Sequence, residues 1–271
     1  MIDIEGQKKI AVLIDADNTP YNKLAAILQE IAVHGHIITK RAYGDFSSTH
    51  LKHWKDVLNE NAILPVQQFS YTKGKNSSDS AMIIDAMDLL YTEKYDAFVL
   101  VSSDSDFTKL ASRLRESQEF VFGVGQKKTP VSFIKACDDF IYIENLTEEP
   151  ETATETPVSR QEENLQKRAP QAETAKQDSK NRANRMSDRQ FRQIYRLLTN
   201  AYEKYADDNG WANVSAAGSL FKRMDPGFDT RDFGFRKLSD LIEYLKDDFE
   251  ITKVAGANGR GMTILYRPKA M

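Results

Sequence analysis

The chain has 271 residues, of which 41% are hydrophobic and 10% aromatic, which is enough for one large or two modest hydrophobic cores. The formal net charge of −3 does not by itself indicate a nucleic-acid-binding protein, and the single cysteine, Cys137, excludes an internal disulfide and a zinc site built from thiolates. No apolar run approaches the roughly 20 residues of a membrane span and the first residues lack a signal-peptide stretch, so we expect a cytoplasmic protein that makes no membrane contact.

Strand and helix patterns alternate over the first 146 residues. Continuous apolar runs at 10–16 and 97–102 are typical of strands buried in a parallel sheet. The first helix is expected to follow at once, with Asn18 as its cap and Pro20 in its first turn. This alternation predicts an α/β fold, a parallel sheet with helices on both faces. The other expected strands are 36–43, 62–66, 120–124 and 140–143, and the other expected helices are 49–61, 77–93, 107–117 and 131–137.

A change of composition separates this region from the C-terminal part of the chain. Residues 147–187 contain almost no large apolar side chains, so we expect a flexible linker there. From residue 188 the apolar spacing becomes helical again, at Phe191, Ile194, Tyr195 and Leu198, and further helices are expected at 214–224 and 231–247. Two strand-like stretches then flank a Gly-rich turn at 257–261. Three helices followed by a hairpin predict a small winged helix-turn-helix domain.

Acidic residues follow both of the buried strands. Asp15 and Asp17 come at the end of the first run, and Asp104 and Asp106 come just after the second. Because ligands bind at the carboxyl ends of parallel strands, these carboxylates are expected to point into one crevice. Carboxylate oxygens suit Mg²⁺ or Mn²⁺, and the corresponding chemistry is metal-assisted attack on a phosphate. The alternative is that they are solvated acids of surface loops.

Two further aspartates lie on the helix that begins near Ser77. Asp79 falls in its first turn, where it supplies either another carboxylate to the crevice or only a favourable interaction with the helix dipole. Asp85 lies about 240° further around the helix, so it is a weaker candidate ligand. Asn18 is a candidate for orienting a neighbouring carboxylate or a water molecule.

Five basic residues fall in expected loops or strand ends near the acidic crevice. Lysine and arginine at such places would hold a phosphate backbone while a metal reaches the reacting group. For each one taken singly, a solvated surface role is the simpler explanation. They are Arg41, Lys73, Lys75, Lys127 and Lys128.

Three stretches of the first region resemble the NYN family of the PIN-like nuclease superfamily. They are IDADN at 14–18, NSSDSAMIIDAMDLL at 76–90 and VLVSSDSDFTKL at 99–110, and they occur in the family's order. The likeness runs over residues 10–146. Residues 188–268 resemble the OST-HTH, or LOTUS, module through FRQIYRLL at 191–198, the stretch 211–245 and the hairpin that begins with FEI at 249.

The resemblance implies three parts: a PIN-like Rossmannoid nuclease domain at 1–146, a linker at 147–187 and a winged-helix domain at 188–271. It implies a ribonuclease that depends on Mg²⁺ or Mn²⁺, in which one ion activates water and a second stabilises the leaving oxygen. RNA is the implied partner. A homodimer and a protein partner of the winged helix are further possibilities. In matching positions, the acidic site is Asp15, Asp79, Asp104 and Asp106, flanked by Asp17 and Asn18. In the second domain, the basic residues on or near helices that could face RNA are Lys222, Arg223, Arg236 and Lys237.

Two other functions remain open at this point. The stretch IDADNT also fits the opening motif of haloacid-dehalogenase-like phosphatases, in which Asp15 would be the nucleophile and Asp17 the acid and base. That family does not account for the helix bearing Asp79 or for a winged-helix partner. The second alternative is a non-catalytic adaptor that binds RNA or protein.

Overall fold

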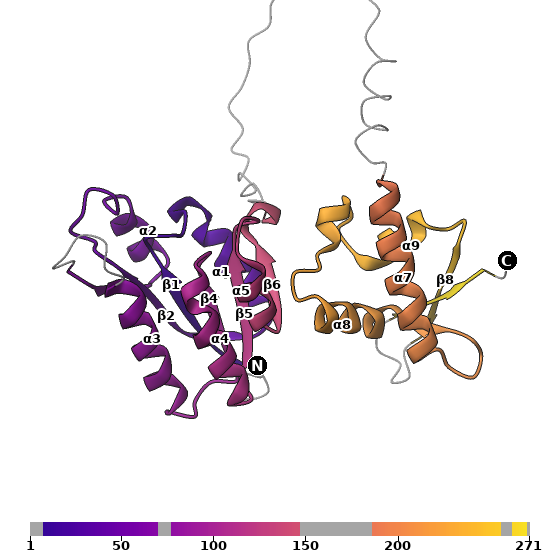
Figure 1. The fold of residues 1–271 in the computed structure, drawn as a ribbon, viewed down its shortest axis with the longest axis horizontal. Coiled ribbons are helices and arrows are strands. Elements are labelled where there is room, and N and C mark those ends of the chain that lie inside the picture. The colour runs from indigo at the N-terminus through magenta and orange to yellow at the C-terminus, as the bar shows by residue number, and fades with distance from the viewer. Residues whose placement is uncertain (1–7, 70–76, 147–185, 256–261, 270–271) are drawn as a thin grey trace, which may run out of the picture. The chain divides into compact units, whose positions relative to one another are not determined.

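The computed structural model describes residues 8–69, 77–146, 186–255 and 262–269 (Figure 1). The chain divides into two compact units, one made of residues 1–147 and 214–229 and the other of 148–213 and 230–271. The domain boundaries expected after residues 146 and 187 stay predictions, and most of the expected linker lies outside the described residues. Among the described helices, none has the length and apolar character needed to cross a membrane.

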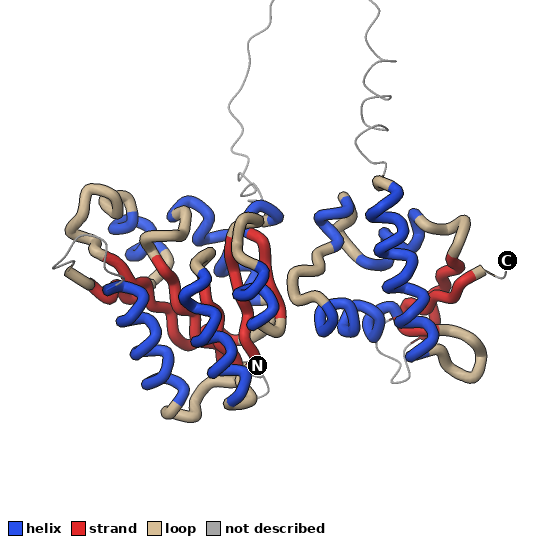
Figure 2. The backbone as a smooth tube through the Cα atoms, viewed as in Figure 1, coloured by secondary structure: helices blue, strands red, loops and turns tan. Residues whose placement is uncertain are grey.

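A six-stranded parallel sheet organises the N-terminal region. Its strand order is β3-β2-β1-β4-β5-β6, so β1 and β4 are neighbours although about 80 residues separate them along the chain. This confirms the expected α/β class, with helices on both faces of a parallel sheet (Figure 2). The strands are β1 (Lys9–Asp15), β2 (His36–Gly44), β3 (Leu64–Gln67), β4 (Ala97–Val101), β5 (Phe120–Gly125) and β6 (Asp139–Tyr142).

The sheet is covered on both faces because alternate residues of a strand point in opposite directions. In β1, Ile10, Val12 and Ile14 belong to one core, together with apolar residues of helices α1 (Leu24–Ala32) and α2 (Trp54–Glu60). Ala11 and Leu13 belong to the other core. The helices on that face are α3 (Ser77–Leu90), α4 (Thr108–Glu116) and α5 (Val131–Ala136).

The expected start of the first helix is wrong. A 3₁₀ turn, η1 (Tyr21–Lys23), follows Pro20, and the α-helix begins only at Leu24. Asn18 caps neither element, since Pro20 and Lys23 hold the two cap positions, and the Asn18 backbone and side-chain N–H groups donate to the carboxylate of Asp15. A proline disfavours the helical conformation for the residue before it, so the first helical turn starts after Pro20 and not at Asn18.

The C-terminal region contains the expected three helices and hairpin. The helix α7 (Asp188–Tyr205) begins with a capping box formed by Ser187 and Gln190. The helix expected at 231–247 is instead a 3₁₀ turn, η4 (Thr230–Phe233), followed by a shorter helix, because Gly234 between them has a φ of 84°. The remaining elements are β7 (Ala212–Asn213), α8 (Val214–Met224), α9 (Leu238–Tyr244), β8 (Phe249–Ala255) and β9 (Met262–Pro268).

An antiparallel sheet of order β7-β9-β8 completes this region. Ile194 and Leu198 of α7, Leu241 of α9 and Phe249 of β8 are buried. The buried hydroxyl of Tyr266 on β9 donates to the Leu198 carbonyl at 2.9 Å. The Gly-rich turn expected at 257–261 lies outside the described residues, but the strands on either side of it pair as a hairpin should.

Candidate metal centre

The sheet order creates a topological switch point at the carboxyl ends of β1 and β4. The chain leaves β1 and β4 toward opposite faces of the sheet, and ligands bind at such a switch point in open α/β sheets. Ile14 pairs with Val101 in the sheet register, so Asp15 and Ser102 come next to each other where the two strands end. The hydroxyl of Thr19 donates to the Val101 carbonyl at 3.3 Å and helps to hold the two ends together.

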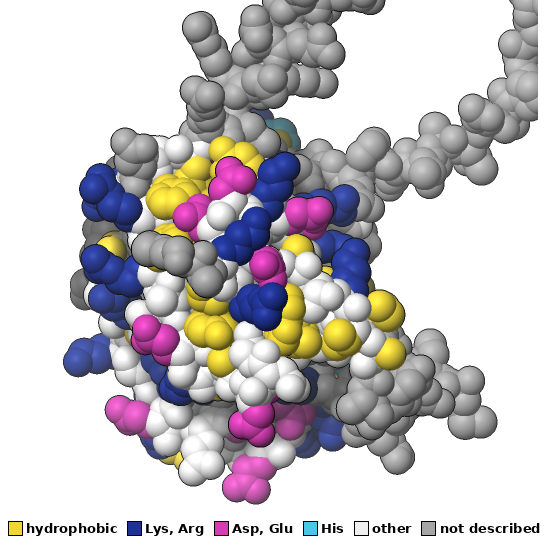
Figure 3. Space-filling model, turned by 90° about the vertical axis from the view of Figure 1, so that its right-hand side faces the viewer, with side chains coloured by type: hydrophobic (Ala, Val, Ile, Leu, Met, Phe, Trp, Pro, Cys, Tyr) yellow, Lys and Arg dark blue, Asp and Glu magenta, His cyan; other side chains and the backbone are white. Residues whose placement is uncertain are grey.

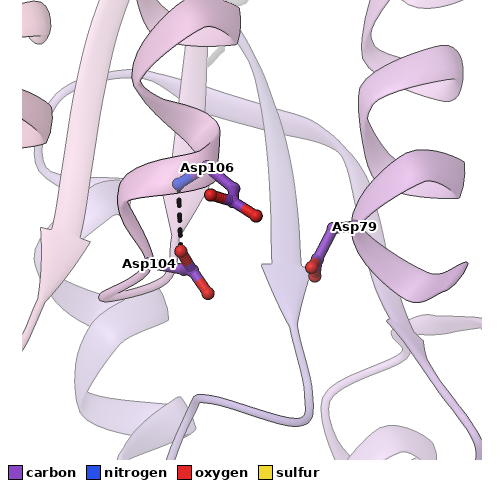
Figure 4. Close-up of side chains that lie close together, drawn as sticks. All are labelled: Asp79, Asp104 and Asp106. Atoms are coloured by element: carbon purple, nitrogen blue, oxygen red, sulfur yellow. Dashed lines mark hydrogen bonds between the residues drawn. The ribbon is translucent and has the colours of Figure 1, made fainter. Parts of the chain in front are cut away.

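Three carboxylates converge at this switch point. Each of Asp79, Asp104 and Asp106 offers an oxygen, and the three oxygens lie within 4.8 Å of one another (Figure 4). We call these three residues the carboxylate cluster. Asp79 comes from the first turn of α3, whereas the other two belong to the turn after β4 and point across to it. Their burial ranges from buried through intermediate to exposed, so the cluster is open to solvent on one side.

Backbone geometry fixes the two aspartates that follow β4. Asp104 is the N-cap of a 3₁₀ turn, η2 (Ser105–Phe107), and its Oδ1 accepts the backbone N–H of Asp106 at 2.9 Å. The Asp104 N–H donates in turn to the hydroxyl of Ser102 at 3.1 Å. Both aspartates are therefore held by the local turn, which leaves the second oxygen of Asp104 free of this capping bond.

Asp15 lies beside the carboxylate cluster but is not one of its three members. Its side chain is almost fully buried, with a relative exposure of 1%. One oxygen accepts the hydroxyl of Ser102 at 2.7 Å and the side-chain amide of Asn18 at 2.9 Å, and the other accepts the Asn18 backbone N–H at 3.3 Å. Ser102 thus connects Asp15 to the backbone of Asp104. Through this contact Asp15 helps to position Asp104 within the cluster.

Negative charge accumulates at this site. Burial, followed by the nearby charges of Asp15 and the other acids, raises the pKa of the Asp79 carboxyl to about 6. Burial also raises the pKa of Asp15, against the opposing effect of its hydrogen bonds with Ser102 and Asn18. Such shifts show that ionising the group is costly, and a bound divalent cation would remove that cost. The donor set, three carboxylates with an open side, fits Mg²⁺ or Mn²⁺.

The two other acidic candidates, Asp17 and Asp85, lie in different places. Asp17 is exposed, and its carboxylate accepts the hydroxyl of Ser78 at 2.9 Å, which ties the end of β1 to the first turn of α3. Asp85 is not brought to the cluster. Its carboxylate binds the guanidinium of Arg41 and the hydroxyl of Tyr43, both on β2. The six-residue offset along α3 turns Asp85 toward β2, as helix geometry requires.

This ion pair also changes the interpretation of Arg41. The guanidinium that was expected to face RNA is bound to Asp85, and its pKa is raised by that hydrogen bond. Burial is the largest cause of the raised pKa of the neighbouring Tyr43 hydroxyl, and its bond to Asp85 adds to it. The ion pair between Arg41 and Asp85 holds α3 against β2 and so positions the helix that carries Asp79.

The remaining basic candidates lie in separate places. Lys127 and Lys128 are exposed after β5, at the same edge of the sheet as the cluster, and the Lys127 backbone N–H donates to Glu144. Lys73 and Lys75 lie outside the described residues. On the face drawn in Figure 3, basic side chains are interspersed with acidic ones. In the C-terminal region, Lys222 and Arg223 occupy the last turn of α8, and Arg236 and Lys237 immediately precede α9.

One contact at the site has only a weak sequence signal. Ser78 lies in the first turn of α3, and its hydroxyl donates to Asp17, which is 61 residues away along the chain. A small hydroxyl residue next to an acid in the first turn of a helix is common for capping alone, so the spacing does not distinguish the two roles.

We expect Ser102→Ala to destabilise the protein by about 1–3 kcal/mol, because the buried Asp15 carboxylate would lose one of its hydrogen bonds and the Asp104 backbone N–H would lose its acceptor. Thermal unfolding measures this as a fall in Tm. Ser105→Ala is the matched control, since Ser105 is exposed and its hydroxyl makes no hydrogen bond within the described residues. Equal Tm values for wild type and Ser102→Ala would show that the serine bridge is not structural.

Comparisons with known proteins identify two regions. A family model for the NYN domain matches residues 9–144, about half of the chain, and a model for the OST-HTH/LOTUS domain matches residues 187–260. The similar solved structures include a protein of unknown function from Vibrio parahaemolyticus, 20% identical, with a TM-score of 0.43 over 53% of this chain and 96% of that one. They also include an uncharacterized protein from Nitrosomonas europaea, 24% identical, with a TM-score of 0.27 over 42% of this chain and 94% of that one. No curated protein matches.

Proposed function

The chain belongs to the NYN domain family, and from this membership we propose that it is a divalent-metal-dependent ribonuclease that hydrolyses RNA phosphodiester bonds. The observation that carries the proposal is the convergence of Asp79, Asp104 and Asp106 within 4.8 Å at the switch point of the sheet. Phosphodiester cleavage needs charge neutralisation at a phosphate, and an acidic site provides this only through a bound cation. The raised pKa of Asp79 fits a site that is completed by such a cation.

In this proposal each residue has a distinct role. The three cluster carboxylates would hold Mg²⁺ or Mn²⁺, which would supply Lewis-acid chemistry at the phosphate. Asp15, fixed by Asn18 and Ser102, adds negative charge beside the cluster and holds the end of β1 against that of β4. Asp17 and Asn18 flank the same opening. The region that matches the OST-HTH/LOTUS domain would bind RNA and keep it near the cluster.

The two alternative functions fare differently. A phosphatase of the haloacid-dehalogenase type needs an accessible nucleophile at Asp15, but that carboxylate is 1% exposed and accepts three hydrogen bonds. No contact among the described residues supports the phosphatase reaction. A non-catalytic adaptor would keep the same fold, and it is therefore one of the outcomes that the next experiment distinguishes.

The proposed function predicts metal-dependent cleavage of RNA. We expect the full-length protein to cleave an end-labelled single-stranded RNA with Mn²⁺ or Mg²⁺ and to leave it intact with EDTA, because ionised carboxylates alone repel the phosphate. Gel electrophoresis of the products measures cleavage, and fluorescence anisotropy of the same RNA measures binding. Binding without cleavage under every metal condition would support the adaptor and overturn the nuclease proposal.

A further inference from the structure

An exposed aromatic pair lies at the same edge of the sheet as the carboxylate cluster. Tyr21 is the first residue of η1, and His53 immediately precedes α2. Their rings are stacked, with centroids 5.5 Å apart and an angle of 21° between the ring planes. The Tyr21 side chain is 41% exposed although it is a large aromatic residue, so part of its ring remains available to another flat group.

The topology places this pair and the cluster at the same edge of the sheet. Tyr21 follows the carboxyl end of β1 and His53 follows that of β2, and these two strands are direct neighbours, with Asp15 paired to Tyr43. Between β1 and Tyr21 lies Asp17, whose carboxylate contacts Ser78 in the first turn of α3, one residue before Asp79. The aromatic pair and the carboxylate cluster therefore border the same strand end, from opposite faces of the sheet.

Positive charge accompanies the aromatic pair. Lys52 and Lys55, on either side of His53, are both exposed. Neither lysine forms an ion pair with any residue that the structure describes. An aromatic ring with flanking lysines is the combination with which proteins bind single-stranded nucleic acid, since the ring stacks on a base and the cations contact phosphates.

We propose that Tyr21, whose ring stacks on that of His53, stacks in turn on an unpaired base of the RNA that binds at the carboxylate cluster. The inference rests on the proposed function and adds a side chain that contacts a base of the RNA. A base within a duplex is already stacked on its neighbours and paired, so only a single strand or a loop can offer a free face to Tyr21. Lys52 and Lys55 would contact the phosphates that flank this base.

The test is a binding experiment that does not depend on cleavage. The full-length Asp104→Asn protein is titrated with a short fluorescent single-stranded RNA, with and without the added change Tyr21→Ala. We expect Tyr21→Ala to weaken binding about tenfold, within the range for loss of one base stack, and Tyr21→Phe to preserve it. Tyr91→Ala is the matched control, because Tyr91 is 71% exposed and follows the C-terminal end of α3, far along the helix from Asp79.

Two further measurements make the result specific to the base. An RNA with an abasic site at the contacted position should bind the parent protein as weakly as Tyr21→Ala binds the intact RNA, with no additional loss in the combination. Photocrosslinking with 5-iodouridine should label the peptide that contains Tyr21. Unchanged binding by Tyr21→Ala, or crosslinks found only within residues 187–269, would overturn the proposal. Neither result bears on whether metal-dependent cleavage occurs.

Discussion

Replacement of Asp104 by asparagine should reduce metal-dependent RNA cleavage by at least about a hundredfold, since loss of an outer-shell partner of a metal already costs up to that much. Asparagine has the shape of aspartate, and its amide oxygen can still accept the Asp106 N–H, so the turn after β4 should remain intact. The variant removes only the charge with which the cluster would hold a cation. The measurement is the single-turnover cleavage rate with saturating Mn²⁺.

The design of this experiment separates catalysis from folding and from RNA binding. Asp88→Asn is the matched control, because Asp88 is an exposed carboxylate on α3, nine residues from Asp79. We expect this control to cleave at the wild-type rate and both variants to bind RNA normally. Cleavage by Asp104→Asn at the wild-type rate would show that the cluster is not the active site.

Replacement of Asp79 by asparagine should stabilise the metal-free protein and remove its response to Mn²⁺. Asp79 is buried, and its pKa is raised to about 6 by burial and by the charges of four other aspartates, so its ionised form destabilises the folded state at neutral pH. In the wild type, Mn²⁺ at a hundred times its Kd would contribute about 2.7 kcal/mol of stability, a rise in Tm of roughly 5–10 °C. The variant should lose this rise and gain Tm in EDTA.

The pH dependence of this effect has a definite sign. The folded pKa of Asp79 lies above the ordinary value of 3.8, so the folded state binds the proton more tightly than the unfolded state. The penalty is therefore fully present above about pH 6 and is relieved as the pH falls toward 4. Protonation also competes with the metal, so the Mn²⁺-induced rise in Tm should be large at pH 7.5 and small at pH 5. Equal rises at both values, or an unchanged rise in Asp79→Asn, would contradict a role for Asp79 as a ligand.

Stability and function would then oppose each other at this site. The cluster keeps several carboxylates together at a cost to the metal-free fold, which is common at sites that bind a charged ligand. The Ser102 bridge between Asp15 and Asp104 limits that cost by satisfying buried polar groups. The expected fall in Tm of Ser102→Ala tests the stabilising bridge, and the expected rise in Tm of Asp79→Asn without metal tests the cost of the clustered charges.

Much of the fold could be predicted because its signals are local. The apolar runs of β1 and β4 are long enough and bounded clearly enough to identify buried strands, and the alternation with helices predicts a parallel sheet. The helix starts were less predictable. Asn18 has the residue type of a cap, yet the first helical turn begins only after Pro20, because a proline disfavours the helical conformation for the residue before it, Thr19. The Asn18 amide instead donates to the buried carboxylate of Asp15.

The sequence by itself determined the α/β class, the order of the elements, the presence of acids after two buried strands and the two family resemblances. These depend on run length, periodicity and short motifs, which a chain carries locally. Only the tertiary structure decided that β1 lies beside β4, that Asp79 joins Asp104 and Asp106 while Asp85 binds Arg41, and that Tyr21 stacks on His53. Such contacts join residues tens of positions apart, and they depend on how helices pack across a sheet, which no local pattern specifies.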